Sequence, residues 1–370
     1  MFLDKLDHRV KQIKNPYLRA LAPYAIVGGG AFAFALIIML ACRSAYICEN
    51  IYVPVAGFLS MRAAIASAYF SFSFAEIALY ALVIWFVIYG VMTAVKIITR
   101  PGKLMTLMKY GLLMAAIASV GLFLYTLMWG QSYYRYPLAQ RMDLDVKARP
   151  IEDVYKLGLM LIDEINADQG AASAAQAARD DPPAFGDMSA VVALAAGSYY
   201  GVNTMPAVKP VLASEAMAYL NLTGIYIPIT GESNVSKRNT PPFIPLTMAH
   251  ETAHRMCTAR EDEANFEAFM ILMDCDDAFA RYSARIYGLN WVSNALYSSD
   301  RELWRGLWDQ YPEGVARDFT ESSEFWRQYR TPVAETSQKI NDTFLKAQGQ
   351  TDGVRSYGRA LDLLLAFYLG

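Results

Sequence analysis

The sequence predicts a mainly α-helical protein in which a three-helix membrane anchor precedes an α+β domain with a small sheet. The first observation is composition, because 55% of the 370 residues are hydrophobic, more than a typical soluble protein contains. The second is distribution, because the apolar excess lies in the first 130 positions. Residues 131–370 are more polar and numerous enough for one domain with its own core. We therefore expect a tail and anchor over 1–130 and a folded domain over 131–370.

Three apolar segments predict the helices of the anchor. They lie at about residues 23–42, 77–98 and 110–129. About 20 residues of helix rise about 30 Å, which matches the hydrocarbon core of a bilayer. The glycines at 28–30 lie inside the first segment, where they favour close helix packing rather than a nucleotide-binding loop. A lipid bilayer is therefore an expected partner of the chain.

Basic residues around these segments predict the orientation. The N-terminal tail and the loop between the second and third segments are rich in lysine and arginine. The only basic residues in the loop between the first and second segments are Arg43 and Arg62. Because cytoplasmic loops carry the excess of positive charge, we expect a multi-pass protein of the cytoplasmic (inner) membrane. Its N-terminus should lie in the cytoplasm and residues 131–370 outside it.

Charge and cysteine content exclude one class of function and leave one question open. The net charge is −2, and no basic stripe or phosphate-cradling loop is present, so we expect no nucleic-acid partner. The four cysteines fall on the expected outer side, where disulfides can persist. Cys42–Cys48 and Cys257–Cys275 are candidate bridges, and the sequence leaves the pairing open.

Local patterns predict the first elements of the outer domain. Residues 153–165 have the spacing of an amphipathic helix, whereas residues 167–187, rich in Ala, Asp and Pro, predict a loop or lid. The apolar, β-prone residues 224–229 predict a strand. Pro228 has no N–H to donate, so we expect this strand at the edge of its sheet. A peptide substrate could pair with such an edge and lie extended across a site.

The segment 249–254 carries the most specific chemical signal. Residues four apart share one face of a helix, so His250 and His254 can hold one metal ion. Glu251 lies beside them, where it can take a proton from a metal-activated water, as in the H-E-x-x-H arrangement of zinc peptidases. Thr247 is the expected N-cap of this helix. The motif fixes only three residues, so the alternative is a coincidental match.

A third ligand is expected just downstream, because zinc hydrolases usually supply three protein ligands. A second helix is predicted over about 261–287, and Thr258 and Glu261 have the spacing of a capping box at its start. Glu261 is expected to bind the metal, and Asn265 to hydrogen-bond a ligand from one turn further along. Glu263 is the alternative third ligand, in which case Glu261 is only a capping carboxylate.

This combination resembles the gluzincins, in which E-x-x-A-N or E-x-x-A-D follows H-E-x-x-H and supplies the third zinc ligand through its first Glu. The chain matches that pattern at Glu261, Ala264 and Asn265. The resemblance implies a zincin-like metallopeptidase domain that binds Zn²⁺. The short spacer departs from the pattern, because Met256 and Cys257 stand where related sequences often carry glycine. Cys257 could also approach the metal.

The C-terminal region adds a core helix and a candidate catalytic residue. The apolar run 361–369 is short for a membrane span and predicts a helix of the domain core. Tyr357 is expected to reach the site and donate a hydrogen bond to the developing oxyanion. The alternative for Tyr357 is a buried structural role.

Several segments together resemble an uncharacterised bacterial family of membrane proteins, a domain of unknown function with three N-terminal spans and an outer H-E-x-x-H domain. The matching segments are Trp129 with Tyr133–Arg135, Gly224–Tyr226, His250–Phe266 and Gly353–Tyr357. The resemblance covers most of the chain. It implies a zinc peptidase but no particular substrate.

These patterns predict a membrane-anchored zinc peptidase that acts on a peptide or protein substrate. His250, His254 and Glu261 are the expected Zn²⁺ ligands, with Glu251 as the general base. One alternative is a catalytically inactive zinc-binding scaffold or receptor-like domain, whose metal would be closed by a fourth ligand. A second alternative is a membrane assembly protein in which the motif is accidental.

Overall fold

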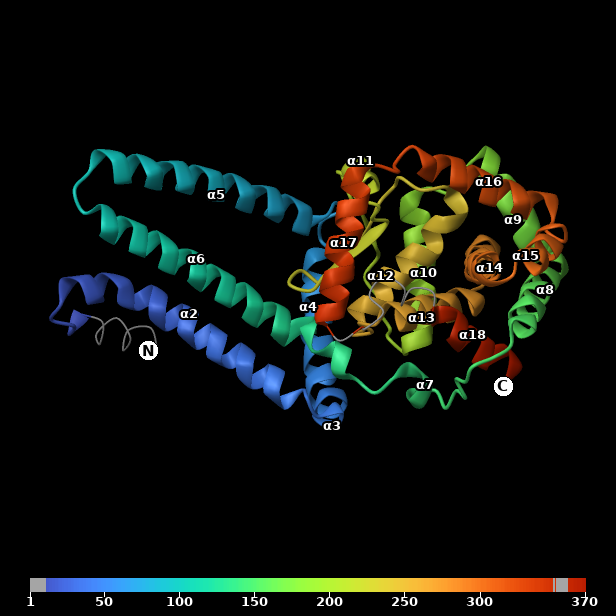
Figure 1. Ribbon diagram of the computed structural model, residues 1–370, viewed down its shortest axis with the longest axis horizontal. Helices are drawn as coiled ribbons and strands as arrows, with labels where there is room; N and C mark the ends of the chain where they lie inside the picture. The colour runs from blue at the N-terminus through green and yellow to red at the C-terminus, as the bar shows by residue number, and fades with distance from the viewer. Residues whose placement is uncertain (1–10, 349, 351–358) are drawn as a thin grey trace. The chain divides into compact units, whose positions relative to one another are not determined.

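The chain was analysed as a computed structural model that describes residues 11–348, 350 and 359–370 (Figure 1). It is mainly helical (75%) with one small three-stranded sheet, which confirms the predicted mixture of many helices and few strands. Contacts within the chain divide it into two compact units. The first unit combines residues 1–56 and 75–134, and the second combines residues 57–74 and 135–370.

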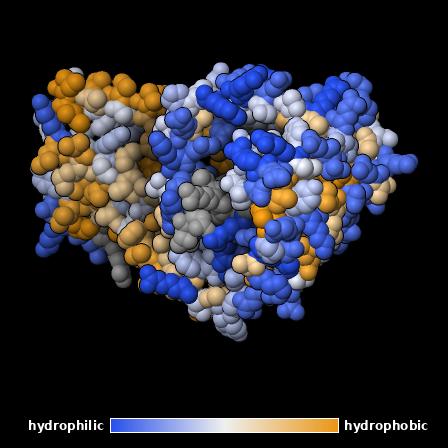
Figure 2. All heavy atoms as spheres, turned by 45° about the vertical axis from the view of Figure 1, so that its right-hand side comes forward, coloured by the Kyte–Doolittle hydropathy of each residue, from blue (hydrophilic) through white to orange (hydrophobic). Residues whose placement is uncertain are grey.

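Three long apolar helices dominate the first unit: α2 (Pro16–Ala41), α5 (Phe74–Thr99) and α6 (Lys103–Tyr125). Each is long and apolar enough to cross a membrane, α6 as part of an apolar stretch that continues to Tyr134. Most of their side chains are exposed, and Figure 2 shows hydrophobic residues over this part of the surface. The three predicted apolar helices are thereby confirmed. The shorter elements here are α3 (Ala45–Ile47), η1 (Cys48–Tyr52), η2 (Thr126–Gly130) and η3 (Ser132–Tyr134).

Small residues let α2 and α6 pack closely. A Cβ atom built on Gly28 would lie 2.9 Å from the Cα of Ala116, closer than such atoms approach in proteins. This contact confirms the predicted helix-packing role for Gly28, whereas a Cβ atom on Gly29 or Gly30 would meet nothing within 4 Å. Tyr89 of α5 stacks on Tyr110 of α6 with ring centroids 5.8 Å apart. The four cysteines of the chain are free thiols, so neither candidate bridge is present.

The second unit surrounds a small sheet with helices. Its strands are β1 (Lys209–Pro210), β2 (Gly224–Ile227) and β3 (Glu232–Val235). Its first helices are the end of α4 (Val53–Ser67), then α7 (Leu138–Arg141), α8 (Ile151–Ala167), α9 (Gln169–Asp180), α10 (Phe185–Tyr200), α11 (Ser214–Tyr219) and η4 (Pro241–Phe243). Those that follow are α12 (Ile244–Arg255), α13 (Glu261–Met273), α14 (Ala278–Ser299), α15 (Arg301–Trp308), α16 (Glu313–Arg327), α17 (Pro332–Ala347) and α18 (Ala360–Leu369).

The sheet has the order β1-β3-β2, so β2 is an edge strand as predicted. β3 lies in the middle and pairs parallel with β1 and antiparallel with β2. In the antiparallel pair, Gly224 lies opposite Val235 and Ile227 opposite Glu232. Pro228 follows the last paired residue of β2, where its missing N–H costs no ladder hydrogen bond.

Residues 57–74, which link two of the apolar helices in the chain, belong to the same folded unit as the sheet. The Lys209 ammonium donates to the carbonyl of Ser67 (2.6 Å) and forms a buried ion pair with Glu232. Glu232 also accepts from the backbone N–H of Phe74 at 3.0 Å. The Ser60 hydroxyl hydrogen-bonds that of Tyr226 on β2. The unit is therefore larger than the expected domain over 131–370, because this loop of the anchor contributes to it.

The predicted loop over 167–187 was wrong for most of its length. Residues 169–180 form α9, and Asp168 caps it by accepting from the N–H of Ala171 at 3.0 Å. Alanine has the highest helix propensity, which outweighs the Asp and Pro content that suggested a loop. Only the short stretch around Pro182 and Pro183 lies outside regular structure.

The predicted single helix over 261–287 was also wrong, because the chain breaks it into α13 and α14. α13 ends at Met273, and Asp277 caps α14 by accepting from the N–H of Ala280 at 2.8 Å. A run of acidic side chains between two apolar helices therefore marks a new N-terminus.

The core of the second unit lies between α8, α13, α14 and α18. Phe266 and Phe269 on α13 are fully buried. Leu361 and Leu364 on α18 are also buried, so the predicted C-terminal core helix is confirmed. α8 contains residues 153–165, which were predicted as an amphipathic helix, and it buries Leu157 and Leu161. This core fixes α13, whose first residue belongs to the candidate site.

Candidate metal centre

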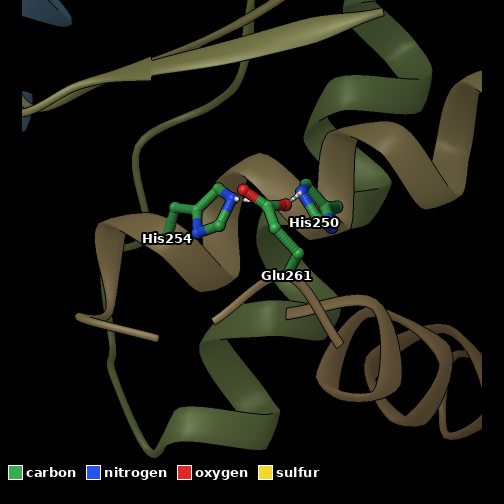
Figure 3. A group of neighbouring side chains, drawn as sticks. All are labelled: His250, His254 and Glu261. Atoms are coloured by element: carbon green, nitrogen blue, oxygen red, sulfur yellow. Dashed lines mark ion pairs between the residues drawn. The ribbon is translucent and has the colours of Figure 1, made fainter. Parts of the chain in front are cut away.

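Three side chains predicted as metal ligands converge between α12 and α13 (Figure 3). His250 and His254 lie one turn apart on α12, with ring centroids 4.5 Å apart. Glu261 is the first residue of α13 and projects between them. Its Oε2 lies 3.2 Å from His250 Nε2 and 3.6 Å from His254 Nε2. The chain thus brings two imidazoles and one carboxylate to a single point.

The spacing of these atoms fits a small divalent cation. Ligand bonds to zinc of about 2.0–2.2 Å in a tetrahedral arrangement put the ligand atoms about 3.3 Å from one another. The group His250, His254 and Glu261 offers ligand atoms that all lie within 4.8 Å of one another. The neighbouring Glu251 is buried, and its Oε2 has no hydrogen-bond partner among the described residues. Two imidazoles and a carboxylate form a ligand set that a metal ion would complete. A further ligand on that metal would supply the hydrogen-bond partner that Glu251 Oε2 lacks.

The competing ligands are directed elsewhere. Glu263 accepts from the N–H of Leu138 at 2.8 Å and from Arg260 at 2.7 Å, so its carboxylate is engaged away from the histidines. Cys257 does not belong to the group of candidate ligands found in the described part of the chain. The geometry therefore favours Glu261 as the third member of the set.

The short turn between the two helices forms without glycine because Cys257 adopts the left-handed conformation, with φ 63°. The N–H of Cys257 donates to the carbonyl of His254 (3.0 Å), and the N–H of Thr258 donates to that of Ala253 (3.1 Å). Arg135 donates to the Cys257 carbonyl at 3.1 Å and so covers the outside of the turn. These bonds close α12 in the way that a C-terminal glycine usually does.

Thr258 orients His254 instead of capping α13, so the predicted capping box was wrong. The Nδ1 of His254 lies 2.6 Å from the Thr258 carbonyl, which can only accept. Nδ1 therefore carries the proton and Nε2 is directed at the site. The Thr258 hydroxyl donates to Glu267 at 2.6 Å, and Tyr200 donates to the same oxygen. Sequence reasoning missed Glu267, because a buried carboxylate in an apolar helix carries no motif.

The start of α12 also differs from the prediction. The helix begins at Ile244 rather than after Thr247, whose hydroxyl donates back to the Phe243 carbonyl at 2.9 Å. Pro245 in the first turn supplies a helical φ and lacks the N–H that would need a partner there. At the other end, Arg255 is fully buried and donates to the Gly231 carbonyl at 3.0 Å, which fastens α12 to the β2–β3 turn.

Burial and mutual charge set the protonation of the site. Burial raises the pKa of Glu251 to about 6. Burial lowers the pKa of His254, but the Glu261 carboxylate outweighs it and raises that pKa to about 9. Burial likewise opposes ionisation of Glu261, yet the two histidines hold its pKa well below the ordinary value. A cation bound here would replace the proton on His254, because a metal-bound imidazole is neutral.

Gly224 of the edge strand lies directly against the predicted general base. A Cβ atom built on Gly224 would lie 2.7 Å from the Cγ of Glu251. The Ser233 hydroxyl of β3 donates to the backbone carbonyl of Glu251 at 2.7 Å. The sheet therefore packs on Glu251 from one side, and only a residue without a side chain fits at position 224.

Two predicted members of the site stand apart from this geometry. Asn265 is buried one turn after Glu261, and it lines a cavity of about 690 Å³ together with His250 and Glu251. Its hydrogen bond to a metal ligand stays a prediction. Tyr357 lies outside the described residues.

Fold and site together define a mainly helical protein with three candidate membrane-spanning helices and a buried His-His-Glu group. The chain belongs to the family described as "Protein of unknown function (DUF3810)", whose profile matches residues 49–365. This match confirms the predicted resemblance to an uncharacterised membrane family. Neither the curated proteins nor the solved structures include a significant match.

Proposed function

We propose that this protein is a membrane-anchored zinc peptidase with a zincin-like site. The observation that carries the proposal is the convergence of His250, His254 and Glu261 beside a buried, unpaired carboxylate oxygen of Glu251. Three ligands leave a tetrahedral metal one open position, as hydrolytic sites require and structural sites usually do not. This feature favours a peptidase over a closed zinc-binding scaffold.

His250, His254 and Glu261 would hold the metal. Zinc bound there would supply the Lewis acidity needed to activate water and to polarise the scissile carbonyl. The Thr258 carbonyl keeps the proton of His254 on Nδ1, so that Nε2 stays available as a ligand. Glu267 in turn accepts from the Thr258 hydroxyl, and Tyr200 holds Glu267 by donating to the same oxygen.

Glu251 would act as general base and then as general acid. Its carboxylate follows His250 on the same helix and lines the large cavity, so it can receive a proton from the attacking water. It can then pass that proton to the leaving amine. Gly224 and Ser233 position it, one by leaving space and the other by a hydrogen bond to its backbone.

The edge strand β2 would align the substrate. Gly224 and Thr223, at and before its start, line the same cavity as His250 and Glu251. A peptide that pairs with the open side of β2 would therefore extend past the site. The excess of basic residues in the tail and the second loop favours a protein of the cytoplasmic (inner) membrane with the site outside the cytoplasm.

Substitution of the general base tests the proposal. Glu251→Gln removes the proton acceptor but none of the three ligands, so the full-length variant should bind one zinc per chain and lose hydrolysis. Metal content is measured by mass spectrometry of the purified protein. Glu261→Ala should lose the metal, whereas the matched control Glu263→Ala should keep it. Turnover by Glu251→Gln at the wild-type rate, or a wild-type chain that binds no metal, would overturn the proposal.

A further inference from the structure

The cavity beside the candidate metal centre continues into a groove. The first part, of about 690 Å³, holds His250 and Glu251 in its wall. A second cavity of about 350 Å³ shares Thr223, Tyr287, Asn290 and Asn294 with it. The two cavities therefore adjoin along α14, and the first contains the candidate centre. We call the two together the carboxamide groove.

Side-chain amides recur along this groove. They come from α13, from α14, from α17 and from the segments before β2 and α12: Asn221, Asn239, Asn265, Asn290, Asn294, Gln338 and Asn341. Among the described residues that line either part, His250 and Glu251 are those that can carry charge near neutral pH. The walls away from the centre are thus uncharged, with amides set among apolar and aromatic side chains.

A neutral wall of amides matches the main chain of a peptide. Each carboxamide offers a donor and an acceptor, the same pair that a peptide group presents, so it can bind the backbone whatever the side chain is. A charged side chain or chain terminus would find no partner of opposite charge along these walls away from the centre. The groove therefore selects an internal and uncharged stretch of chain.

The aromatic residues of the groove favour a peptide over a sugar. Tyr287 packs on Phe243 and on Trp291, with ring centroids 5.2 and 6.2 Å apart, and Trp291 is only 8% exposed. Close to the centre, these rings therefore mainly support one another and offer little open face on which a sugar ring could stack, whereas the half-buried Phe319 and Trp326 lie in the second part of the groove.

We propose that the carboxamide groove binds an internal, uncharged segment of a peptide by its main chain, an inference that rests on the proposed peptidase function. The proposal makes the protein an endopeptidase. Asn290 and Asn294 would hold the segment from α14, and Gln338 from α17. Glu251 and the candidate ligand His250 line the first cavity but not the second, so the scissile bond would be placed at that end.

Calorimetric titration of the full-length, zinc-loaded Glu251→Gln protein tests this specificity without turnover. The probes are an N-acetylated, C-amidated octapeptide of Ala, Ser, Asn and Gln, and two versions with Lys or Glu at the two central positions. The neutral peptide should bind at least tenfold more tightly than either charged one. Asn290→Ala, Asn294→Ala and Gln338→Ala should each weaken it about fivefold, the usual effect of one lost hydrogen bond.

Two further measurements keep the outcomes distinct. Asn203 is exposed and lines a different cavity, so Asn203→Ala is the matched control and should leave binding unchanged. Gln338 is exposed on α17, so its variant should fold even if those on α14 do not. Equal binding of the charged peptides, unchanged binding by all three variants, or preference for a chito-oligosaccharide would overturn the inference. Wild-type protein that binds the neutral peptide without cleaving it would overturn the peptidase function and leave the groove standing.

Discussion

Cys257 has the most constrained backbone near the candidate metal centre. Its φ of 63° lies in the left-handed region, which residues with a Cβ atom enter at a cost of about 1–2 kcal/mol. The position is tolerated because Arg135 and the two N–H bonds of the turn stabilise it. The absence of glycine therefore changes the energy of the turn but not its path.

Replacement of this residue should separate the backbone cost from the side chain. Cys257→Gly and Cys257→Ala both remove the buried thiol, but only glycine relieves the left-handed strain. The Gly variant should therefore be more stable than the Ala variant by about 1 kcal/mol. Chemical denaturation of both proteins measures the difference in free energy of unfolding. An Ala variant as stable as the Gly variant would show that the turn carries no strain.

The positions of the candidate ligands were predictable because the relation among them is local. The four-residue spacing of His250 and His254 fixes their common face as soon as the segment is helical. Glu261 follows after a turn too short to reach elsewhere. Arg135, Glu267 and Gly224 were not predictable as parts of the site, because their contacts with it depend on tertiary packing. A motif specifies the ligands and leaves out the residues that orient them.

At the scale of elements, a charged cluster ties α9 to α14. Asp168, the N-cap of α9, accepts from Arg281 and from Arg285, each at 2.9 Å. The hydrogen bond from Arg281 is the largest cause of a lowered pKa at Asp168, and that from Arg285 adds to it, although burial opposes both. The ionised carboxylate thus links two helices that adjoin the core.

This cluster predicts an acid-dependent loss of stability. A carboxyl group whose pKa is lower in the folded state adds stability above its unfolded pKa of about 3.9, and loses it as the pH falls toward the folded value. Asp168→Asn keeps a capping oxygen but no charge. Wild type should be more stable than this variant at pH 7, and the difference should shrink at pH 3. Urea denaturation at the two pH values checks this, and a gap of equal size would refute the electrostatic role.

Elements were predictable where apolar spacing was strong and unpredictable where two local signals competed. The periodic apolar residues of α8 and the compact apolar run of α18 each favoured a helix over any other secondary structure. In α9, helix-forming alanines competed with Asp and Pro. Between α13 and α14, an acidic capping segment interrupted a continuous apolar pattern. In both cases the helix-capping aspartate, Asp168 or Asp277, was the signal that could have decided the assignment.

For the whole molecule, the buried pair of Lys209 and Glu232 joins two distant parts of the chain into one folded unit. Both side chains are nearly inaccessible, at 8% and 0% exposure. Lys209 also donates to Ser67, and Glu232 accepts from Phe74. The pair therefore attaches the C-terminal part of segment 57–74 to the sheet, which packs against α12.

Breaking this pair should destabilise the folded unit strongly. Lys209→Met leaves the buried Glu232 without its ion-pair partner, and breaking such a pair typically costs about 3–5 kcal/mol. The double variant Lys209→Met/Glu232→Gln removes both charges and still offers an acceptor to Phe74, so it should lose less. Thermal unfolding of the detergent-solubilised proteins compares the two. A double variant less stable than the single would contradict this account.

This organisation was not visible in the sequence. Residues 57–74 look like a loop between two apolar helices, and a boundary after the third helix is the simplest division of the composition. Only the tertiary contacts of Ser67 and Phe74 assign the loop to the second unit.

The second unit is built from two separate stretches of the chain, and this constrains when it can fold during synthesis. Phe74 leaves the ribosome well before its partner Glu232, which follows 158 positions later. At about 5–20 residues per second, the two are separated by roughly 10–30 s of synthesis. During that interval the aromatic stretch that ends at Phe74 has no sheet on which to fold. Assembly of the unit is therefore necessarily a late step, which follows the synthesis of β3.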